Sequence, residues 1–187
     1  GVGLYEVTQK DGARCSSAVA YLQPARSRPN LEVVTGALVR RILLANGRAT
    51  GVAYAKDGVE TQAQADREVL LSGGAINSPQ LLMLSGIGPA DHLREVGIDV
   101  RVDSPGVGSN LQDHPEAVIS WECTQRMTRD STQWWEIGIF SPTQEGLELP
   151  DLMMHYGSVP FDMHTRRQGY PTSPESFALT PNVTHAK

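Results

Sequence analysis

The segment from Glu68 to Pro89 constrains the fold of this chain more than any other stretch of its sequence. It opens with the uninterrupted apolar run Val69–Leu71, which is typical of a strand covered on both faces. Gly73 and Gly74 follow and interrupt the run. A strand that leads through glycines into a helix is a joint of α/β domains, so the segment predicts that fold class.

A helix is predicted to begin at Ser78, because its hydroxyl can cap a free amide and Pro79 suits the first helical position, where no N–H is needed. Leucines at helical spacing supply an apolar face, and glycines with a proline end the helix: Leu81, Leu82, Leu84, Gly86, Gly88 and Pro89. A glycine turn at a helix N-terminus lets backbone approach a phosphate or a ribose closely. An ordinary strand-to-helix joint has the same pattern, and the residues alone leave both interpretations open.

The composition excludes several classes of protein. The 187 residues are 40% hydrophobic with a net charge of −5, which allows a core and argues against a nucleic-acid surface, since that would need clustered Lys and Arg. Cys15 and Cys123 are the only cysteines, and their spacing predicts neither a disulfide framework nor a zinc site. No run is long and apolar enough to predict a membrane span.

An antiparallel meander is predicted before the central segment. The dipeptides Asn46-Gly47 and Asp57-Gly58 lie at hairpin spacing between short segments of β character. The predicted strands are residues 31–35, 38–45, 49–56 and 59–63. Ser16–Leu22, further upstream, predicts one or two helical turns.

Beyond Pro89 the sequence predicts a short helix to Glu95, a strand over Ile98–Val102 and a loop dense in glycine and proline over Asp103–Pro115. Rigid loops of this length carry function more often than packing. We place a domain boundary near its end, between residues 113 and 114. Three further strands of a larger sheet are predicted over residues 117–122, 152–158 and 177–185.

Acid–base and aromatic side chains gather in the last third of the sequence: His114, Glu116, Trp134, Trp135, His155 and Phe161. Each has an ordinary structural interpretation, as a solvated carboxylate, a core histidine, or core and interface rings. A carboxylate with several aromatic rings is also the combination that holds a quaternary ammonium ion, because such a cation has no hydrogen-bond donor and is held by charge and ring faces. The sequence permits this cluster without showing that its members meet.

The run Glu68–Pro89 closely resembles the second signature segment of the glucose-methanol-choline (GMC) family of flavin-dependent alcohol oxidoreductases. The resemblance implies a mixed α/β chain, with part of a GMC-type FAD-binding domain over residues 1–113 and part of an antiparallel-sheet substrate domain over residues 114–187. It implies FAD as the cofactor, with cofactor contacts from Val39, which would lie against the adenine, and from Ser72, Gly73, Gly74 and Ala75. For Val39, a place in a sheet core is an equally good interpretation.

The resemblance is greatest to the choline-oxidising members of the family, and three segments carry it: residues 112–116, 131–140 and 150–162. It implies oxidation of choline through betaine aldehyde to glycine betaine, with electrons passing from covalently bound FAD to molecular oxygen. Glu116 matches the carboxylate that binds the trimethylammonium group, and Trp135 and Phe161 match aromatic residues of its pocket. His155 matches a histidine that positions the substrate and stabilises the alkoxide, and His114 matches a nearby active-site histidine.

Other interpretations stay open. The signature segment would also suit a GMC oxidase or dehydrogenase that acts on another alcohol, and a choline dehydrogenase would use an acceptor other than oxygen. A non-catalytic module that retains part of the fold is a further alternative. We expect a cytoplasmic protein with no nucleic-acid partner, no membrane span and no metal ion, and a homodimer is an open alternative to a monomer.

The sequence has no GxGxxG fingerprint and begins at Gly1 without an initiator methionine, so we interpret it as an internal fragment. We expect the 187-residue chain, expressed alone, neither to bind FAD tightly nor to oxidise choline. Gel filtration after incubation with FAD tests this expectation. A flavin absorbance band that stays with the protein peak would contradict it.

Overall fold

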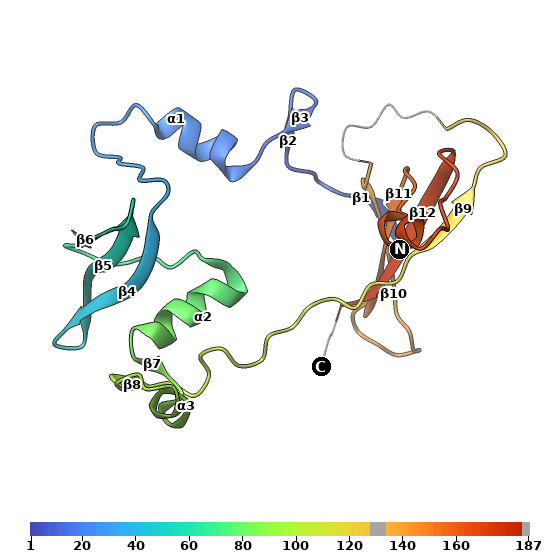
Figure 1. Ribbon diagram of the computed structural model, residues 1–187. Helices are drawn as coiled ribbons and strands as arrows, with labels where there is room; N and C mark the ends of the chain where they lie inside the picture. The colour runs from blue at the N-terminus through green and yellow to red at the C-terminus, as the bar shows by residue number, and fades with distance from the viewer. Residues whose placement is uncertain (128–133, 185–187) are drawn as a thin grey trace. The chain divides into compact units, whose positions relative to one another are not determined.

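The structure, a computed structural model, describes residues 1–127 and 134–184 (Figure 1). The chain divides into two compact units, of which one comprises residues 1–31 with 112–187 and the other residues 32–111. We call them the sheet unit and the meander unit. The sequence did not predict that the first 31 residues would join the C-terminal part. The expected domain division after residue 113 stays a prediction.

The meander unit opens with the three-stranded antiparallel sheet that the sequence predicts. Its strands, in spatial order, are β4 (Leu38–Ala45), β5 (Arg48–Lys56) and β6 (Val59–Gln64). Both connections are two-residue turns with positive φ at each residue, 50° and 75° at Asn46-Gly47 and 52° and 80° at Asp57-Gly58. Such turns match the right-handed twist of the strands they join, which explains why this part of the prediction is confirmed.

Two predicted strands of the meander unit are wrong. Residues 31–35 and Val69–Leu71 form no strand in the structure. A strand needs a neighbour for its backbone groups, and no described strand pairs with either segment. Leu70 is 79% exposed, so the run that the sequence predicts to be covered on both faces has neither face covered here.

Helix α2 (Gly74–Leu84) begins four residues before the predicted start. The Gly73 N–H donates to the Ser78 hydroxyl at 3.0 Å, so this serine caps the helix from within rather than from its first position. Gly74 has a φ of 83°, a left-handed conformation that residues with a side chain rarely adopt. Pro79 therefore lies inside the helix, where it removes one backbone donor.

The segment after α2 forms a small second element. β7 (Ile87–Gly88) pairs in parallel with β8 (Val102–Asp103), and α3 (Ala90–Glu95) lies between them in sequence. The Ala90 N–H donates to the Asp103 carboxylate at 3.0 Å, which caps α3. The predicted strand over residues 98–102 is thus mostly irregular and ends in the two-residue β8.

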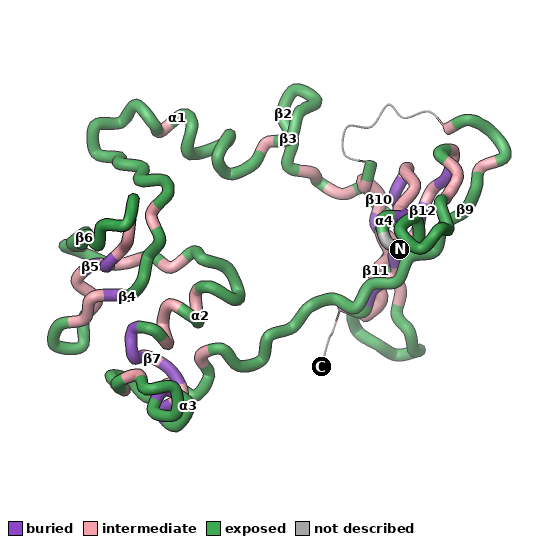
Figure 2. The backbone as a smooth tube through the Cα atoms, in the orientation of Figure 1, coloured by how far each residue is buried: buried purple, intermediate pink, exposed green. Residues whose placement is uncertain are grey.

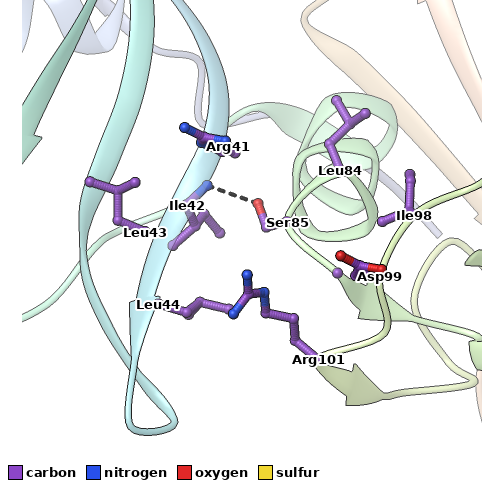
Figure 3. A pocket seen from close by; sticks show the side chains of 10 residues that line it. Arg41, Ile42, Leu43, Leu44, Leu84, Ser85, Ile98, Asp99 and Arg101 are labelled. Atoms are coloured by element: carbon purple, nitrogen blue, oxygen red, sulfur yellow. Dashed lines mark hydrogen bonds between the residues drawn. The ribbon is translucent and has the colours of Figure 1, made fainter.

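A serine joins α2 to the meander. Ser85 follows α2 directly, and its hydroxyl accepts a hydrogen bond from the Ile42 N–H of β4 at 2.8 Å and donates one to the Leu81 carbonyl at 2.6 Å (Figure 3). Ile42 and Ser85 are each only 7% exposed. A cavity of about 310 Å³ lies beside this contact, and its lining includes Arg41 and Arg101.

The sheet unit is built on five antiparallel strands in the order β1-β10-β11-β12-β9. Their bounds are Val2–Leu4 for β1, Ile119–Glu122 for β9, Ile137–Ser141 for β10, Leu152–Gly157 for β11 and Ser176–Val183 for β12. The three strands predicted for the last third of the chain are confirmed as β9, β11 and β12. Ser131–Gln133 and His185, which belong to predicted segments, lie outside the described residues.

Short elements complete the sheet unit. They are the hairpin β2 (Gln9–Lys10) with β3 (Ala13–Arg14), the helical turns η1 (Ala18–Leu22) and α1 (Gln23–Ala25), and helix α4 (Met163–Arg167). The predicted helical turns near Ser16 are therefore confirmed.

Burial is uneven between the elements (Figure 2). Alternate residues of β12 are buried, whereas α2 has no buried residue along its length. No helix in the described part of the chain is long and apolar enough to span a membrane. Within the same residues, no group of three or more His, Cys, Asp or Glu side chains is arranged to hold a metal ion.

The Ser85 contact predicts the effect of one substitution. Ser85→Ala removes the acceptor of the buried Ile42 N–H, and an unpaired buried donor costs about 1–3 kcal/mol. We expect a loss of this size in the local stability of the meander unit. Hydrogen exchange of the Ile42 amide measures it directly.

Ser109→Ala is the matched control, because the Ser109 hydroxyl donates to the Pro105 carbonyl in an exposed loop. We expect it to change the Ile42 exchange rate little. Equal exchange rates in the two variants would show that Ser85 does not hold β4.

Candidate functional site

Four side chains that the sequence singles out line one pocket of the sheet unit. They are Glu116, Trp135, His155 and Phe161, and the cavity between them is about 270 Å³. The four come from separate parts of the unit: a bridge beside β12, the approach to β10, the middle of β11, and the segment that follows β11. The structure brings them together, and their roles stay predictions.

The register of the sheet sets the position of His155. In β11 it lies directly opposite Gly138 of β10 and Thr180 of β12. Side chains opposite one another in an antiparallel sheet point to the same face. Glu116 reaches the same sheet through an isolated bridge to Asn182, two residues beyond Thr180 and therefore on the same face.

The pocket's aromatic wall depends on a glycine. The Trp135 ring occupies the space where Gly157 would carry a side chain, since a Cβ added there would lie 2.6 Å from the ring. The Trp135 ring meets the Phe161 ring edge to face at a centroid distance of 5.4 Å, and it meets the His155 ring at 6.4 Å. Edge-to-face contacts of this kind stabilise a fixed ring arrangement.

Tyr5 contacts the site and was not predicted. Its ring covers Gly138, where an added Cβ would lie within van der Waals overlap of the hydroxyl, and its centroid is 5.5 Å from that of His155. Burial raises the pKa of the Tyr5 phenol. Glycines inside strand patterns signal a close approach of another group, so Gly138 and Gly157 were the signal that could have indicated such neighbours.

Asp162 fixes the segment that carries Phe161. This aspartate is 7% exposed, and its carboxylate accepts hydrogen bonds from the Thr172 N–H at 2.8 Å and from Arg166 Nε at 3.1 Å. The bond from the Thr172 N–H, together with the Arg166 guanidinium, lowers the pKa of the Asp162 carboxyl. The bond between Asp162 and Thr172 closes a loop of ten residues and so fixes the backbone next to Phe161.

A buried stripe on β12 borders the site. Alternate residues Ser176, Ala178, Thr180 and Asn182 are between 0% and 3% exposed. The side-chain oxygens of the three polar members have no hydrogen-bond partner among the described residues, and the same is true of the Tyr5 hydroxyl. Buried polar groups normally have partners, so these oxygens need an explanation.

His114 lies outside the pocket lining. Its Nδ1 is 3.0 Å from the Val183 carbonyl, which can only accept, so this nitrogen carries the proton and Nε2 is left unprotonated in the neutral ring. The side chain is exposed. The structure thus places His114 next to Val183 at the end of β12, one residue along that strand from Asn182, the bridge partner of Glu116. The catalytic role of His114 stays a prediction.

The predicted cofactor contacts all lie in the meander unit. Val39 is in β4 and 37% exposed, so the alternative of a buried core position does not describe it. Ser72, Gly73, Gly74 and Ala75 are exposed at the N-terminus of α2. The first-turn amides of a helix have no acceptor within the helix and can therefore bind an anion.

The pocket combines a carboxylate, two aromatic faces and an imidazole. Such a set attracts an organic cation and offers one group that can donate or accept a proton close by. The cavity beside Ser85 is lined by arginines, one aspartate and aliphatic side chains, and none of the predicted site residues lines it.

Comparisons with known proteins give matches to one family. The family model described as "GMC oxidoreductase" matches residues 1–116. The chain is 54% identical over 191 residues to the choline oxidase of Arthrobacter globiformis, covering 100% of this chain and 35% of that protein. It is 56% identical over 179 residues to the oxygen-dependent choline dehydrogenase of Rhizobium meliloti, covering 83% of this chain and 32% of that protein.

A solved structure, that of pyridoxine 4-oxidase from Mesorbium loti, has the same fold over the whole chain. The TM-score is 0.82 at 28% identity, and the match covers 100% of this chain and 37% of that one. The prediction of a mixed α/β chain related to flavin-dependent oxidoreductases is confirmed.

Gly157→Ala tests the aromatic wall. The added methyl group overlaps the Trp135 ring, and overpacking of this kind costs about 1–3 kcal/mol. We expect a lower melting temperature and a changed near-UV circular dichroism spectrum, since Trp135 must turn away from Phe161.

Gly3→Ala is the matched control in the same sheet, because its added methyl group meets nothing within 4 Å. A Gly157→Ala spectrum that matches that of Gly3→Ala would show that the glycine does not determine the ring position.

Proposed function

The chain belongs to the GMC oxidoreductase family, and from this premise we propose that the whole protein is an FAD-dependent enzyme that oxidises choline. The proposed reaction converts choline through betaine aldehyde to glycine betaine, with molecular oxygen as electron acceptor. The chain spans about a third of the length of the curated relatives it matches, 35% and 32%, so the activity is proposed for the whole protein. A cytoplasmic location and a homodimer stay part of the proposal.

One observation carries the choice of substrate: Glu116, Trp135 and Phe161 line the same pocket as His155. Choline has a permanent positive charge at one end and a hydroxyl at the other. Its trimethylammonium group cannot donate a hydrogen bond, so a protein holds it by charge and by aromatic faces, each worth roughly 0.5–2 kcal/mol. A neutral alcohol has no charge for the carboxylate to attract.

The carboxylate contributes over a longer range than the rings. At about 5 Å and an effective dielectric constant of about 20, a unit charge pair is worth roughly 3 kcal/mol. Glu116 is exposed in the structure, so solvent screens part of this attraction until a ligand covers it. The two rings meet edge to face, which leaves ring faces available to the cation.

His155 is the residue proposed to act at the hydroxyl end. As the hydroxyl proton leaves, negative charge develops on the oxygen, and a donor already aimed at that oxygen stabilises it without reorganisation. The imidazole contacts both the Tyr5 and the Trp135 rings, at 5.5 Å and 6.4 Å between centroids. A ring confined in this way can keep one nitrogen directed at the substrate.

The residues of the meander unit fit part of an FAD site. FAD, when bound, supplies the acceptor for the hydride of the alcohol carbon. The exposed residues Ser72–Ala75 at the start of an 11-residue helix offer backbone donors to a phosphate or ribose. Apart from its chain neighbours and its own helix backbone, nothing lies within 4 Å of the position where Gly74 would carry a Cβ. Val39, exposed on β4, is the proposed contact to the adenine.

The alternative electron acceptor gives a second candidate. The relative from Rhizobium meliloti is named an oxygen-dependent choline dehydrogenase, and the one from Arthrobacter globiformis a choline oxidase. Both names give choline as the substrate. Turnover of the whole protein should therefore be followed both by oxygen consumption and with an artificial electron acceptor.

Glu116→Gln in the whole protein tests the cation site. We expect the KM for choline, or its Kd in rapid-reaction experiments, to rise roughly 100-fold, which corresponds to a charge interaction of about 3 kcal/mol. The uncharged isostere 3,3-dimethylbutan-1-ol should lose less than about threefold, because it has no charge for Glu116 to attract.

Glu122→Gln is the matched control, since Glu122 is an exposed carboxylate of β9 in the same sheet and does not line the pocket. It should leave both substrates unaffected. Equal losses for choline and its isostere in Glu116→Gln would remove the cation-binding role, and wild-type protein that oxidises neither compound would remove the proposed function.

A further inference from the structure

Two hydroxyls flank His155 on its face of the sheet. Thr180 lies directly opposite it on β12, and on the other side the Tyr5 hydroxyl occupies the place of the missing Gly138 side chain. Side chains directly opposite in an antiparallel pair have Cβ atoms about 4.5–5.5 Å apart. Nδ1 is the ring nitrogen nearest to the Cβ of a histidine, so a hydroxyl at the Cβ position of Gly138 is closer to Nδ1 than to Nε2 when Nδ1 faces β10. In the structure the Tyr5 hydroxyl makes no hydrogen bond to His155.

The Tyr5 hydroxyl is a donor without a partner. Its oxygen is buried and has no hydrogen bond among the described residues. Burial raises the pKa of this phenol, which keeps its proton in place at neutral pH. The ring itself is fixed, because it contacts Phe140 edge to face at 6.4 Å and the Tyr5 N–H donates to the Glu136 carbonyl at 2.7 Å.

Thr180 is the competing donor. Its hydroxyl is also buried and unpartnered within the described chain. Of these two hydroxyl-bearing residues, only Tyr5 also contacts the imidazole through a ring, at 5.5 Å between centroids and 51° between planes, and its ring lies over Gly138 of β10.

We infer that Tyr5 is a positioning residue for His155: its hydroxyl donates to Nδ1 and so fixes the imidazole as the tautomer with its proton on Nε2, directed into the pocket. The assignment rests on the proposed oxidation at the same pocket. Hydrogen bonds of functional groups are often long in an empty site and shorten when the substrate binds. A fixed Nε2–H would then be the donor that meets the developing alkoxide.

Tyr5→Phe tests this inference, because it keeps the ring contacts and removes the hydroxyl alone. In the whole protein we expect kcat for choline to fall roughly 10- to 100-fold with KM changed less than about threefold, the range for loss of a group that orients a functional imidazole. Ser176→Ala is the matched control: it removes another buried, unpartnered hydroxyl from the same sheet face, at a position opposite Glu122 rather than His155. It should keep kcat within about twofold.

A second measurement does not depend on turnover. Long-range ¹H–¹⁵N correlation spectra of the ¹⁵N-histidine-labelled chain distinguish the two imidazole tautomers, and His155→Gln assigns the His155 signals among the five histidines. We expect the Nε2–H pattern in the wild-type chain and an averaged pattern in Tyr5→Phe.

Three results would overturn the inference. They are an Nδ1–H tautomer in the wild-type chain, a kcat of Tyr5→Phe equal to that of Ser176→Ala, or a change of the His155 signals in Thr180→Val that Tyr5→Phe does not produce. Wild-type protein that fails to oxidise choline would refute the proposed function, whereas the tautomer measurement would still decide whether Tyr5 orients His155.

Discussion

The pairing of β11 with β10 and β12 is the constraint on which the candidate site depends. Side chains alternate between the faces of a strand, so a slip of one residue would turn His155 to the opposite face. The same register places Gly138 beside His155, and that glycine leaves the space that Tyr5 fills. Glu116 joins the same face through its bridge to Asn182. The pocket is thus a product of backbone hydrogen bonds, with aromatic rings set into gaps left by glycines.

The exposed apolar surface shows what this chain's own contacts do not supply. Leu70, Ile76 and Leu84 are 79%, 69% and 50% exposed, and they belong to the segment that most strongly predicts a buried strand and helix. Full burial of such a side chain is worth about 1.5–3 kcal/mol. The pattern therefore predicts burial that contacts among the described residues do not supply, and the run Val69–Leu71 forms no strand.

Local chemistry was readable from the sequence, and distant contacts were not. The hairpins at Asn46-Gly47 and Asp57-Gly58 follow from two residues each, and the identities of Glu116, Trp135, His155 and Phe161 followed from resemblance to the family. The start of α2 was misplaced because Ser78 caps from inside the helix, an arrangement that looks the same in sequence as a first-position cap. Gly138 indicates that some group approaches β10 closely, but it does not identify Tyr5, which meets His155 across 150 residues of sequence.

The place of β1 in the sheet has a consequence for the order of folding. Val2 pairs with Ile139, so β1 finds this partner only after 137 further residues have been made. The meander unit is contiguous in sequence and its strands are joined by two-residue turns, so it forms from local contacts, which are fast. The five-stranded sheet closes later, because β1 must wait for β10. Until then β1 is an unpaired strand edge, which is the kind of strand most exposed to pairing with another chain.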